Sequence, residues 1–165
     1  MRAMTWSLAV LNDPFDQILH ERGIVLPTPP QPVGSYTPVM VTGNLVFVSG
    51  QIPVQEDQVK FKGKLGKDIS VEVGQQAAKL CIINGLAQLK VAIGQLDRVN
   101  KIVKLTGFVN SDPCFTEHSK VVNGASDLLV DIFGERGKHA RAAVGVNSLP
   151  MDSAVEIEFI AELKS

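Results

Sequence analysis

Apolar and charged positions alternate along residues 154–163, with the two-residue period of a β-strand that has one buried face. The apolar side chains share one face of this strand and the glutamates share the other. The glutamate face is expected to be wetter, and Ile160 within it indicates partial cover, for instance by another subunit. The glutamates are Glu156, Glu158 and Glu162.

A second C-terminal strand is predicted over residues 141–146, and it carries no charge except Arg141 at its start. A guanidinium that opens an apolar strand needs an anionic partner. That partner is either a structural carboxylate, Glu156 or Glu158, or the carboxylate of a substrate. The pattern leaves both interpretations open.

Apolar spacing elsewhere predicts helices over residues 15–22, 70–93 and 121–133, and strands over residues 36–42, 45–49, 59–61 and 98–109. Asp13 and Ser70 are suited to cap the first two helices. Residues 26–32 are rich in proline and predict an extended connector. We therefore predict an α+β fold, with two helices packed on one face of a sheet and an extra N-terminal helix.

The predicted organisation is an N-terminal helix and connector over residues 1–32, followed by a single domain over residues 33–165. Hydrophobic residues make up 45% of the chain, charged residues 20%, and the net charge is −1, so a soluble domain without bulk attraction to nucleic acid or lipid is expected.

Two cysteines in apolar contexts, Cys81 and Cys114, predict buried free thiols in a reducing cytosol. The apolar run 8–11 is too short for a signal peptide, so we expect a cytoplasmic protein without a membrane span.

Several short motifs occur in a fixed order along most of the chain. They are Gly-Ser-Tyr at residues 34–36, Leu-Val-Phe-Val-Ser-Gly-Gln-Ile-Pro at 45–53, Asn123, Ala140-Arg141, Leu149-Pro150 and Val-Glu-Ile-Glu at 155–158. Together they resemble the Rid family of reactive intermediate deaminases, also called YjgF or L-PSP endoribonuclease-like proteins. The run Gly-Lys-His-Ala-Arg-Ala-Ala-Val-Gly-Val further resembles a subfamily with a longer N-terminus.

This resemblance implies a chorismate-mutase-like fold and a homotrimer with clefts between neighbouring subunits. It also implies hydrolysis of small carboxylate-bearing enamines or imines, such as 2-iminopropanoate, to keto acids and ammonia. The family chemistry needs no cofactor and no metal, and His20, His118 and His139 lack the spacing of metal ligands.

The resemblance assigns the catalytic roles to Arg141 and Glu156. Arg141 would hold the substrate carboxylate as a bidentate fork, and Glu156 would position the attacking water. A glutamate close to an arginine is expected to stay ionised and able to accept a proton.

Four further residues match the substrate-binding positions of the family. Tyr36 would line the cleft, Ser49 would hydrogen-bond near the substrate, and the backbone N–H of Ala143 would bind a carboxylate oxygen. Asn123 would shape the cleft while capping the second long helix. Ala143 stands where much of the family has cysteine, so no thiol contributes here.

Two other functions remain open at this stage. The altered cleft suits a non-catalytic protein that binds or senses a small metabolite through Arg141. The older family name and the lysine-rich run 60–67 suit an endoribonuclease, although a solvated hairpin explains that run as well and nucleic acid is not the expected partner.

Overall fold

The structure is a computed structural model that describes residues 13–29 and 35–165. Its helices are α1 (Pro14–Glu21), α2 (Val71–Ile93) and α3 (His118–Phe133), with short 3₁₀ turns η1 (Leu96–Arg98), η2 (Gly134–Gly137) and η3 (Pro150–Asp152). Its strands are β1 (Val39–Thr42), β2 (Leu45–Gln51), β3 (Val54–Gln55), β4 (Gln58–Val59), β5 (Val99–Asn110), β6 (Ala140–Val146) and β7 (Val155–Leu163).

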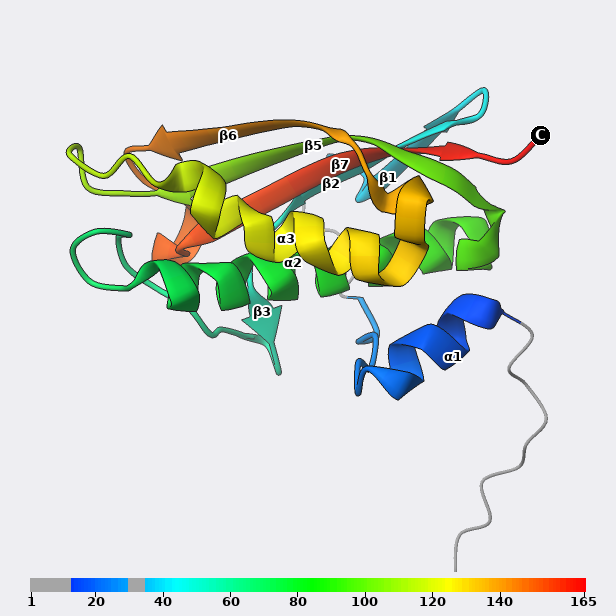
Figure 1. Cartoon of the computed structure of the whole chain (residues 1–165), viewed down its shortest axis with the longest axis horizontal. Coiled ribbons are helices and arrows are strands. Elements are labelled where there is room, and N and C mark those ends of the chain that lie inside the picture. The colour runs from blue at the N-terminus through cyan, green and yellow to red at the C-terminus, as the bar shows by residue number, and fades with distance from the viewer. Residues whose placement is uncertain (1–12, 30–34) are drawn as a thin grey trace, which may run out of the picture.

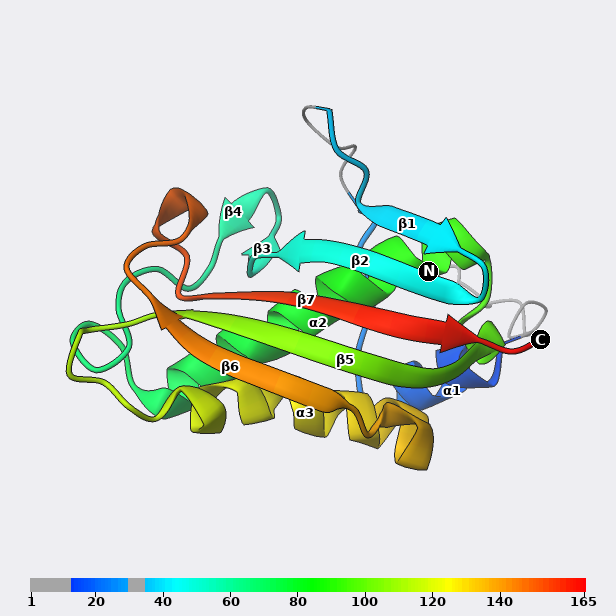
Figure 2. The same ribbon diagram turned by 90° about the horizontal axis from the view of Figure 1, so that it is seen from above.

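Five strands form one sheet in the order β1-β2-β7-β5-β6, and β3 and β4 form a separate hairpin. All neighbours in the sheet are antiparallel except β5 and β6, which are parallel. The parallel pair requires a crossover, and η2 and α3 supply it after β5. Figure 2 shows the sheet face on, with β6 at one edge and β1 at the other.

Helices α2 and α3 lie together on one face of the sheet (Figure 1). The alternation along β7 explains why the helices pack on this face, because the five odd-numbered residues from 155 to 163 are all buried toward the helices. The apolar stripe of α3 is buried against the same core. The predicted α+β arrangement of a sheet with two helices on one face is therefore confirmed.

A β-bulge interrupts the pairing of β2 with β7. Val48 lies opposite Phe159, but Gln51 lies opposite Ile157, so β2 uses three steps where β7 uses two. An extra residue reverses the side on which the following side chains point. Gln51 is consequently turned to the same face as Ile157, the face that carries the helices.

The N-terminal helix α1 docks against the C-terminal ends of α2 and α3, and not against the open face of the sheet (Figure 1). Asp13 is 2% exposed and caps α1 through Phe15 N, while its other oxygen accepts a 2.6 Å bond from Leu96 N. The Phe15 ring packs 4.8 Å from the ring of Phe133. The apolar face of α1 thus extends the core of the domain.

Several boundaries differ from the sequence prediction. The first strand begins at Val39 and not at residue 36, since Pro38 cannot donate a backbone hydrogen bond to a ladder. The second strand continues past residue 49 to Gln51, and the predicted strand over 59–61 is the hairpin of β3 and β4. Helix α3 begins at His118, three residues earlier than predicted.

Other expectations have mixed outcomes. Cys81 is buried as predicted, but Cys114 is exposed in the turn before α3. The connector shows no helix or strand over residues 24–29, while residues 30–32, like the apolar run 8–11, lie outside the described residues. Among the described residues, no helix is long and apolar enough to cross a membrane.

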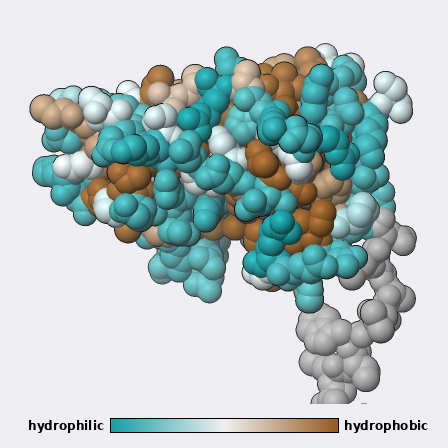
Figure 3. Space-filling view, in the orientation of Figure 1, coloured by the Kyte–Doolittle hydropathy of each residue, from teal (hydrophilic) through white to brown (hydrophobic). Residues whose placement is uncertain are grey.

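The sheet face away from the helices carries exposed apolar side chains. The most exposed are Met40 at 56%, Val144 at 44% and Phe47 at 39%, and no described element covers this face (Figure 2). Figure 3 shows hydrophobic side chains reaching the surface along the upper rim, where the sheet lies in Figure 1. We refer to this surface as the open face.

Candidate functional site

Arg141 lies at the start of the edge strand β6 and points to the helix face of the sheet. Its strand partner is the buried Leu105, and its guanidinium reaches α3. The Nη1 group donates to Asn123 Oδ1 at 2.8 Å and to Ser126 Oγ at 3.1 Å. Asn123 and Ser126 are three residues apart on α3, so their side chains lie on one face of the helix.

These two bonds use both hydrogens of Nη1 and leave the Nη2 and Nε donors without a partner among the described residues. No described carboxylate lies within ion-pair distance of Arg141. A structural ion pair with Glu156 or Glu158 is therefore absent within the described part of the chain. The free Nη2 and Nε edge has the fork geometry that binds a carboxylate through two parallel bonds.

His139 supports Arg141 through Ser126. Its Nδ1 lies 2.6 Å from Gly137 O and its Nε2 lies 3.0 Å from Ser126 Oγ. A carbonyl only accepts, so Nδ1 must donate, and the neutral ring then accepts the Ser126 hydroxyl at Nε2. The Ser126 oxygen is thereby turned toward Arg141 as an acceptor. Burial, and to a lesser extent the Arg141 charge, lower the pKa of His139, which favours this neutral form.

Glu156 lies on the opposite face, near the start of β7. An alanine Cβ built at Gly50 would lie 2.0 Å from Glu156 Oε1, so the carboxylate occupies the space that the glycine leaves. Burial first, and the neighbouring Glu158 second, raise the pKa of Glu156. The nearby arginine expected to hold Glu156 is not Arg141 of the same chain, because Arg141 lies on the other face of the sheet.

The register of the sheet separates Arg141 from Glu156. Arg141 pairs with Leu105 and Glu156 pairs with Phe108, three positions further along β5. Side chains alternate between faces along a strand, so an odd separation places these two on opposite faces. They are also about 10 Å apart along the strand direction, at roughly 3.3 Å per residue. The predicted site residues are therefore divided into two groups, which we call half-sites: Arg141, Asn123 and Ala143 in one, and Glu156, Ser49 and Tyr36 in the other.

The remaining predicted residues complete these half-sites. Asn123 does not cap α3, because Glu117 is at the cap position and Asn123 lies in the second turn, where it holds Arg141. Ala143 is partly buried on the helix face of β6, beside Gly107 of β5. Ser49 donates to Thr37 O at 2.8 Å and ties β2 to the segment before β1. Tyr36 is 59% exposed in that segment.

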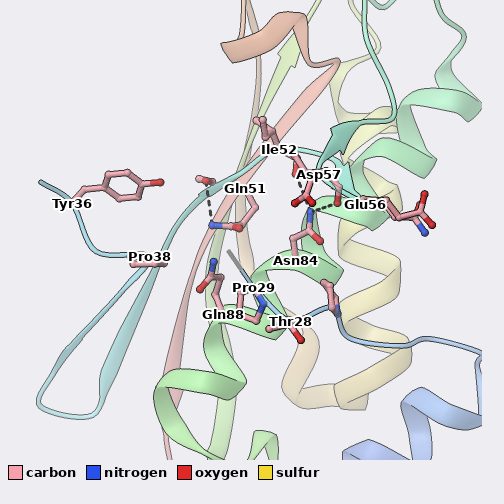
Figure 4. Close-up of a pocket in the computed structure, with 14 residues that line it drawn as sticks. Thr28, Pro29, Tyr36, Pro38, Gln51, Ile52, Glu56, Asp57, Asn84 and Gln88 are labelled. Atoms are coloured by element: carbon pink, nitrogen blue, oxygen red, sulfur yellow. Dashed lines mark hydrogen bonds between the residues drawn. The ribbon is translucent and has the colours of Figure 1, made fainter. Parts of the chain in front are cut away.

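A pocket of about 330 Å³ lies beside the Glu156 half-site. Figure 4 shows its walls, which come from the N-terminal connector, the end of β2, the β3–β4 hairpin and α2. Tyr36 and Gly50 both line it, so the pocket adjoins the residues that resemblance assigns to the site. Across residues 13–29 and 35–165, no group of three or more histidine, cysteine or acidic side chains is placed to hold a metal ion.

Comparison with known proteins identifies the family. The family model described as "YjgF/chorismate_mutase-like, putative endoribonuclease" matches residues 17–163. The chain belongs to the YjgF family. Its relatives include Protein TCP17 of Trypanosoma cruzi, which is 45% identical over 148 residues, or 89% of this chain and 92% of that protein.

Solved structures of similar proteins share the fold. A protein of unknown function from Agrobacterium tumefaciens superimposes with a TM-score of 0.86 at 43% identity, covering 91% of this chain and 92% of that one. The protein TdcF of Escherichia coli, solved with bound serine, superimposes with a TM-score of 0.57 at 27% identity, and the match covers 84% of this chain and 94% of TdcF. The chorismate-mutase-like architecture expected from the motifs is therefore confirmed.

Sequence reasoning missed the groups that hold Arg141 and Glu156 in position. Ser126 had a signal, since it lies three residues after Asn123 on the same helix face. His139 was considered only as a metal ligand, although it is two residues from Arg141. The contact between Gly50 and Glu156 had no signal in the sequence, because it depends on the bulge in β2.

The support of Arg141 by His139 predicts a coupled titration. We expect His139 to titrate below the ordinary histidine pKa of about 6.5, and Arg141→Ala to raise its pKa by removing a like charge. Because the folded-state pKa is lowered, His139 favours the fold above about pH 6.5, and this contribution is lost as pH falls through the folded pKa. Two-dimensional NMR titration of the imidazole measures the pKa directly.

Lys138→Ala provides the control for that titration, since it removes an exposed charge next to His139 that is paired with Glu135. We expect it to leave the His139 pKa close to the wild-type value. A His139 pKa that does not change in Arg141→Ala, or that changes equally in Lys138→Ala, contradicts the proposed coupling.

Proposed function

We propose that this chain hydrolyses a small carboxylate-bearing imine or enamine, such as 2-iminopropanoate, to the keto acid and ammonia. The site lies between two copies of the chain in a homotrimer. It combines Arg141, Asn123 and Ala143 of one copy with Glu156, Ser49 and Tyr36 of the next. No cofactor takes part in this proposal.

The observation that supports it is the pair of uncompensated charged groups on opposite faces of the sheet. Arg141 has a free two-donor edge, and Glu156 is half-buried without a cation among the described residues. Arg141 lacks an anion, which a carboxylate substrate provides. Glu156 lacks a cation, which the Arg141 half-site of a neighbouring copy provides. The bound serine in TdcF shares one feature with the proposed substrates, a carboxylate beside a carbon that bears nitrogen.

The raised pKa of Glu156 suits both proton transfers of imine hydrolysis. The carboxylate accepts a proton from water as the water oxygen forms a bond to the carbon of the protonated imine, and the electron pair of the C=N bond moves to nitrogen. The resulting carbinolamine takes that proton on its nitrogen, the carbon–nitrogen bond breaks, and ammonia leaves. Loss of the hydroxyl proton then gives the keto group. Arg141 fixes the substrate carboxylate, so the imine carbon is held in one place throughout.

The open face is the proposed contact between copies. Met40, Phe47 and Val144 are exposed there, and Ile160 lies partly buried among the glutamates of β7. A second copy on this face removes these side chains from water. It also brings a neighbouring chain, with its own Arg141, to the face that carries Glu156. Within one chain, Arg141 lies on the other face of the sheet.

An endoribonuclease function gains less support. Lys64 donates to Asn110 Oδ1 at 2.8 Å, and Lys60 is paired with Glu56 at 3.0 Å, so two lysines of the basic run are engaged within the chain. The net charge of −1 gives no general attraction to RNA.

The purified protein should accelerate the decay of freshly generated 2-iminopropanoate. We expect Arg141→Ala to lower kcat/KM by about 100-fold, because a charge-assisted pair of hydrogen bonds is lost. Arg141→Lys should remain impaired by about tenfold or more, because an ammonium cannot form the two-donor fork. Loss of the imine and appearance of pyruvate and ammonia measure the rate.

Lys138→Ala is the matched control, as an exposed cation close to Arg141 that should leave the rate unchanged. Equal rates for wild type and Arg141→Ala contradict the assignment of Arg141. Arg141-dependent binding of pyruvate without any imine turnover favours instead a metabolite-binding protein on the same scaffold.

Gly50→Ala tests the position of Glu156. The new methyl group meets only the end of a flexible side chain, so we expect a Tm within about 4 °C of wild type. The carboxylate must move, and we expect the imine hydrolysis rate to fall by about tenfold or more.

Gly107→Ala provides the contrast, since its Cβ would lie 2.5 Å from Val122 Cγ2 in the core. We expect that variant to lose stability by about 1–3 kcal/mol through overpacking. A Gly50→Ala protein with full activity would mean that the observed Glu156 position is not required for the reaction.

A further inference from the structure

The pocket beside Gly50 carries polar groups that the proposed reaction does not use. Asn84 and Gln88 of α2 and Gln51 of β2 face it, together with the Glu56-Asp57 turn of the β3–β4 hairpin (Figure 4). Its apolar walls are Pro27, Pro29, Pro38, Ile52 and Val54. This is the composition of a binding pocket, with a few polar groups set among apolar walls.

The hydrogen bonds of two amides fix which of their atoms remain available. Asn84 Nδ2 donates to Ile52 O at 3.0 Å and to Val54 O at 2.9 Å. Gln51 Nε2 donates to Ser49 O at 2.9 Å and to Gly50 O at 3.3 Å. Carbonyl oxygens only accept, so the nitrogens must occupy these positions. Both amides therefore retain only their oxygens as acceptors for a ligand.

Gln88 adds a third amide to the pocket. The residue is 9% exposed, its side chain lines the pocket, and it makes no side-chain hydrogen bond to another described residue. Among the described residues no sealed side-chain nitrogen or oxygen lacks a partner, so the Gln88 amide is accessible from the pocket. A ligand in the pocket can therefore bond to this amide.

The charge of the pocket selects the kind of ligand. Its lining includes two carboxylates, Glu56 and Asp57, and no lysine, arginine or histidine. Glu56 is paired with Lys60, whereas Asp57 has no ion pair among the described residues. Acceptor oxygens and one uncompensated carboxylate favour a group that donates hydrogen bonds and carries positive charge.

The bulge in β2 connects this pocket to the proposed reaction centre. It turns Gln51 toward α2, while the Glu156 carboxylate lies against Gly50 on the other side of the strand. Gly50 therefore borders both the pocket and the carboxylate. Glycine adds no side chain at this border, so only backbone atoms of residue 50 separate the carboxylate from the pocket.

We propose that the pocket binds the side chain of the substrate and selects 2-imino acids whose side chain ends in a cationic nitrogen group, an amine or a guanidinium. Gln88, Asn84 and Gln51 accept hydrogen bonds from that group, and Asp57 balances its charge. This inference rests on the proposed function for the position of the imine. It makes Gln88 a specificity-determining residue that does not take part in the chemical step.

The test compares imines that differ in the end of the side chain. An amino acid oxidase generates them from L-arginine, from L-norleucine and from L-alanine. We expect wild type to hydrolyse the arginine imine with a kcat/KM about tenfold or more above the norleucine imine. Gln88→Leu should bring that ratio close to one, while the alanine imine is hydrolysed within about twofold of wild type.

Two further variants make the test independent of how well Gln88→Leu folds. Gln88→Glu adds a negative charge to the pocket and should raise the arginine-to-norleucine ratio. Gln76→Leu changes an exposed glutamine on the same helix, outside this pocket, and should leave the ratio unchanged. A wild-type ratio near one, or a ratio that Gln88→Glu does not alter, overturns the inference while the deaminase function stands.

Calorimetry separates failure of the pocket from failure of the reaction. If wild type hydrolyses none of the three imines, the proposed function fails, and binding of L-arginine and L-norleucine then tests the pocket alone. Binding of L-arginine that is lost in Gln88→Leu supports a cation-selective pocket. Absence of L-arginine binding to wild type, or equal binding of both amino acids, rejects it.

Discussion

The register between β5 and its two neighbours is the constraint on which the rest of this structure depends. Leu105 and Phe108 are an odd number of residues apart, so their partners Arg141 and Glu156 point to opposite faces of one sheet. A shift of one residue in the β6 pairing would turn Arg141 to the open face, and a shift in the β7 pairing would turn Glu156 into the core. The core prevents such a shift, because β7 buries every second residue under α2.

Because Arg141 and Glu156 are separated, the surroundings of each chain segment hold its unpaired charge in a different way. Arg141 is held by neutral oxygens, with His139 fixing the hydroxyl of Ser126 behind it. These contacts orient the guanidinium without neutralising it, so its attraction for an anion is retained. Glu156 is instead kept half-buried over a glycine, where its pKa is raised. The charges remain available because no described residue supplies a counter-ion to either Arg141 or Glu156.

The sequence predicted the elements whose cause is local and missed those that depend on tertiary pairing. The caps at Asp13 and Ser70 and the alternation of β7 follow from residue type and spacing, and they were predicted. The buried face of α2 is harder to assign from apolar residues alone, because α2 packs against both the sheet and α3, while its apolar Val91 is 72% exposed. Motif resemblance named Arg141 and Glu156, but only the register shows that one chain cannot join them. The pocket at Gln88 required the bulge in β2, which has no local signature.

The central claim, that Arg141 of one copy acts with Glu156 of another, is tested most directly by subunit mixing. Arg141→Ala and Glu156→Gln chains, each inactive alone, are co-expressed with different tags, and mixed assemblies are purified. In a mixed ring of three, whichever chain is present twice, one of the three sites, or about a third, contains both intact residues. Recovery of roughly that fraction of wild-type imine hydrolysis is the predicted result. Mixed assemblies as inactive as either parent would contradict a shared site.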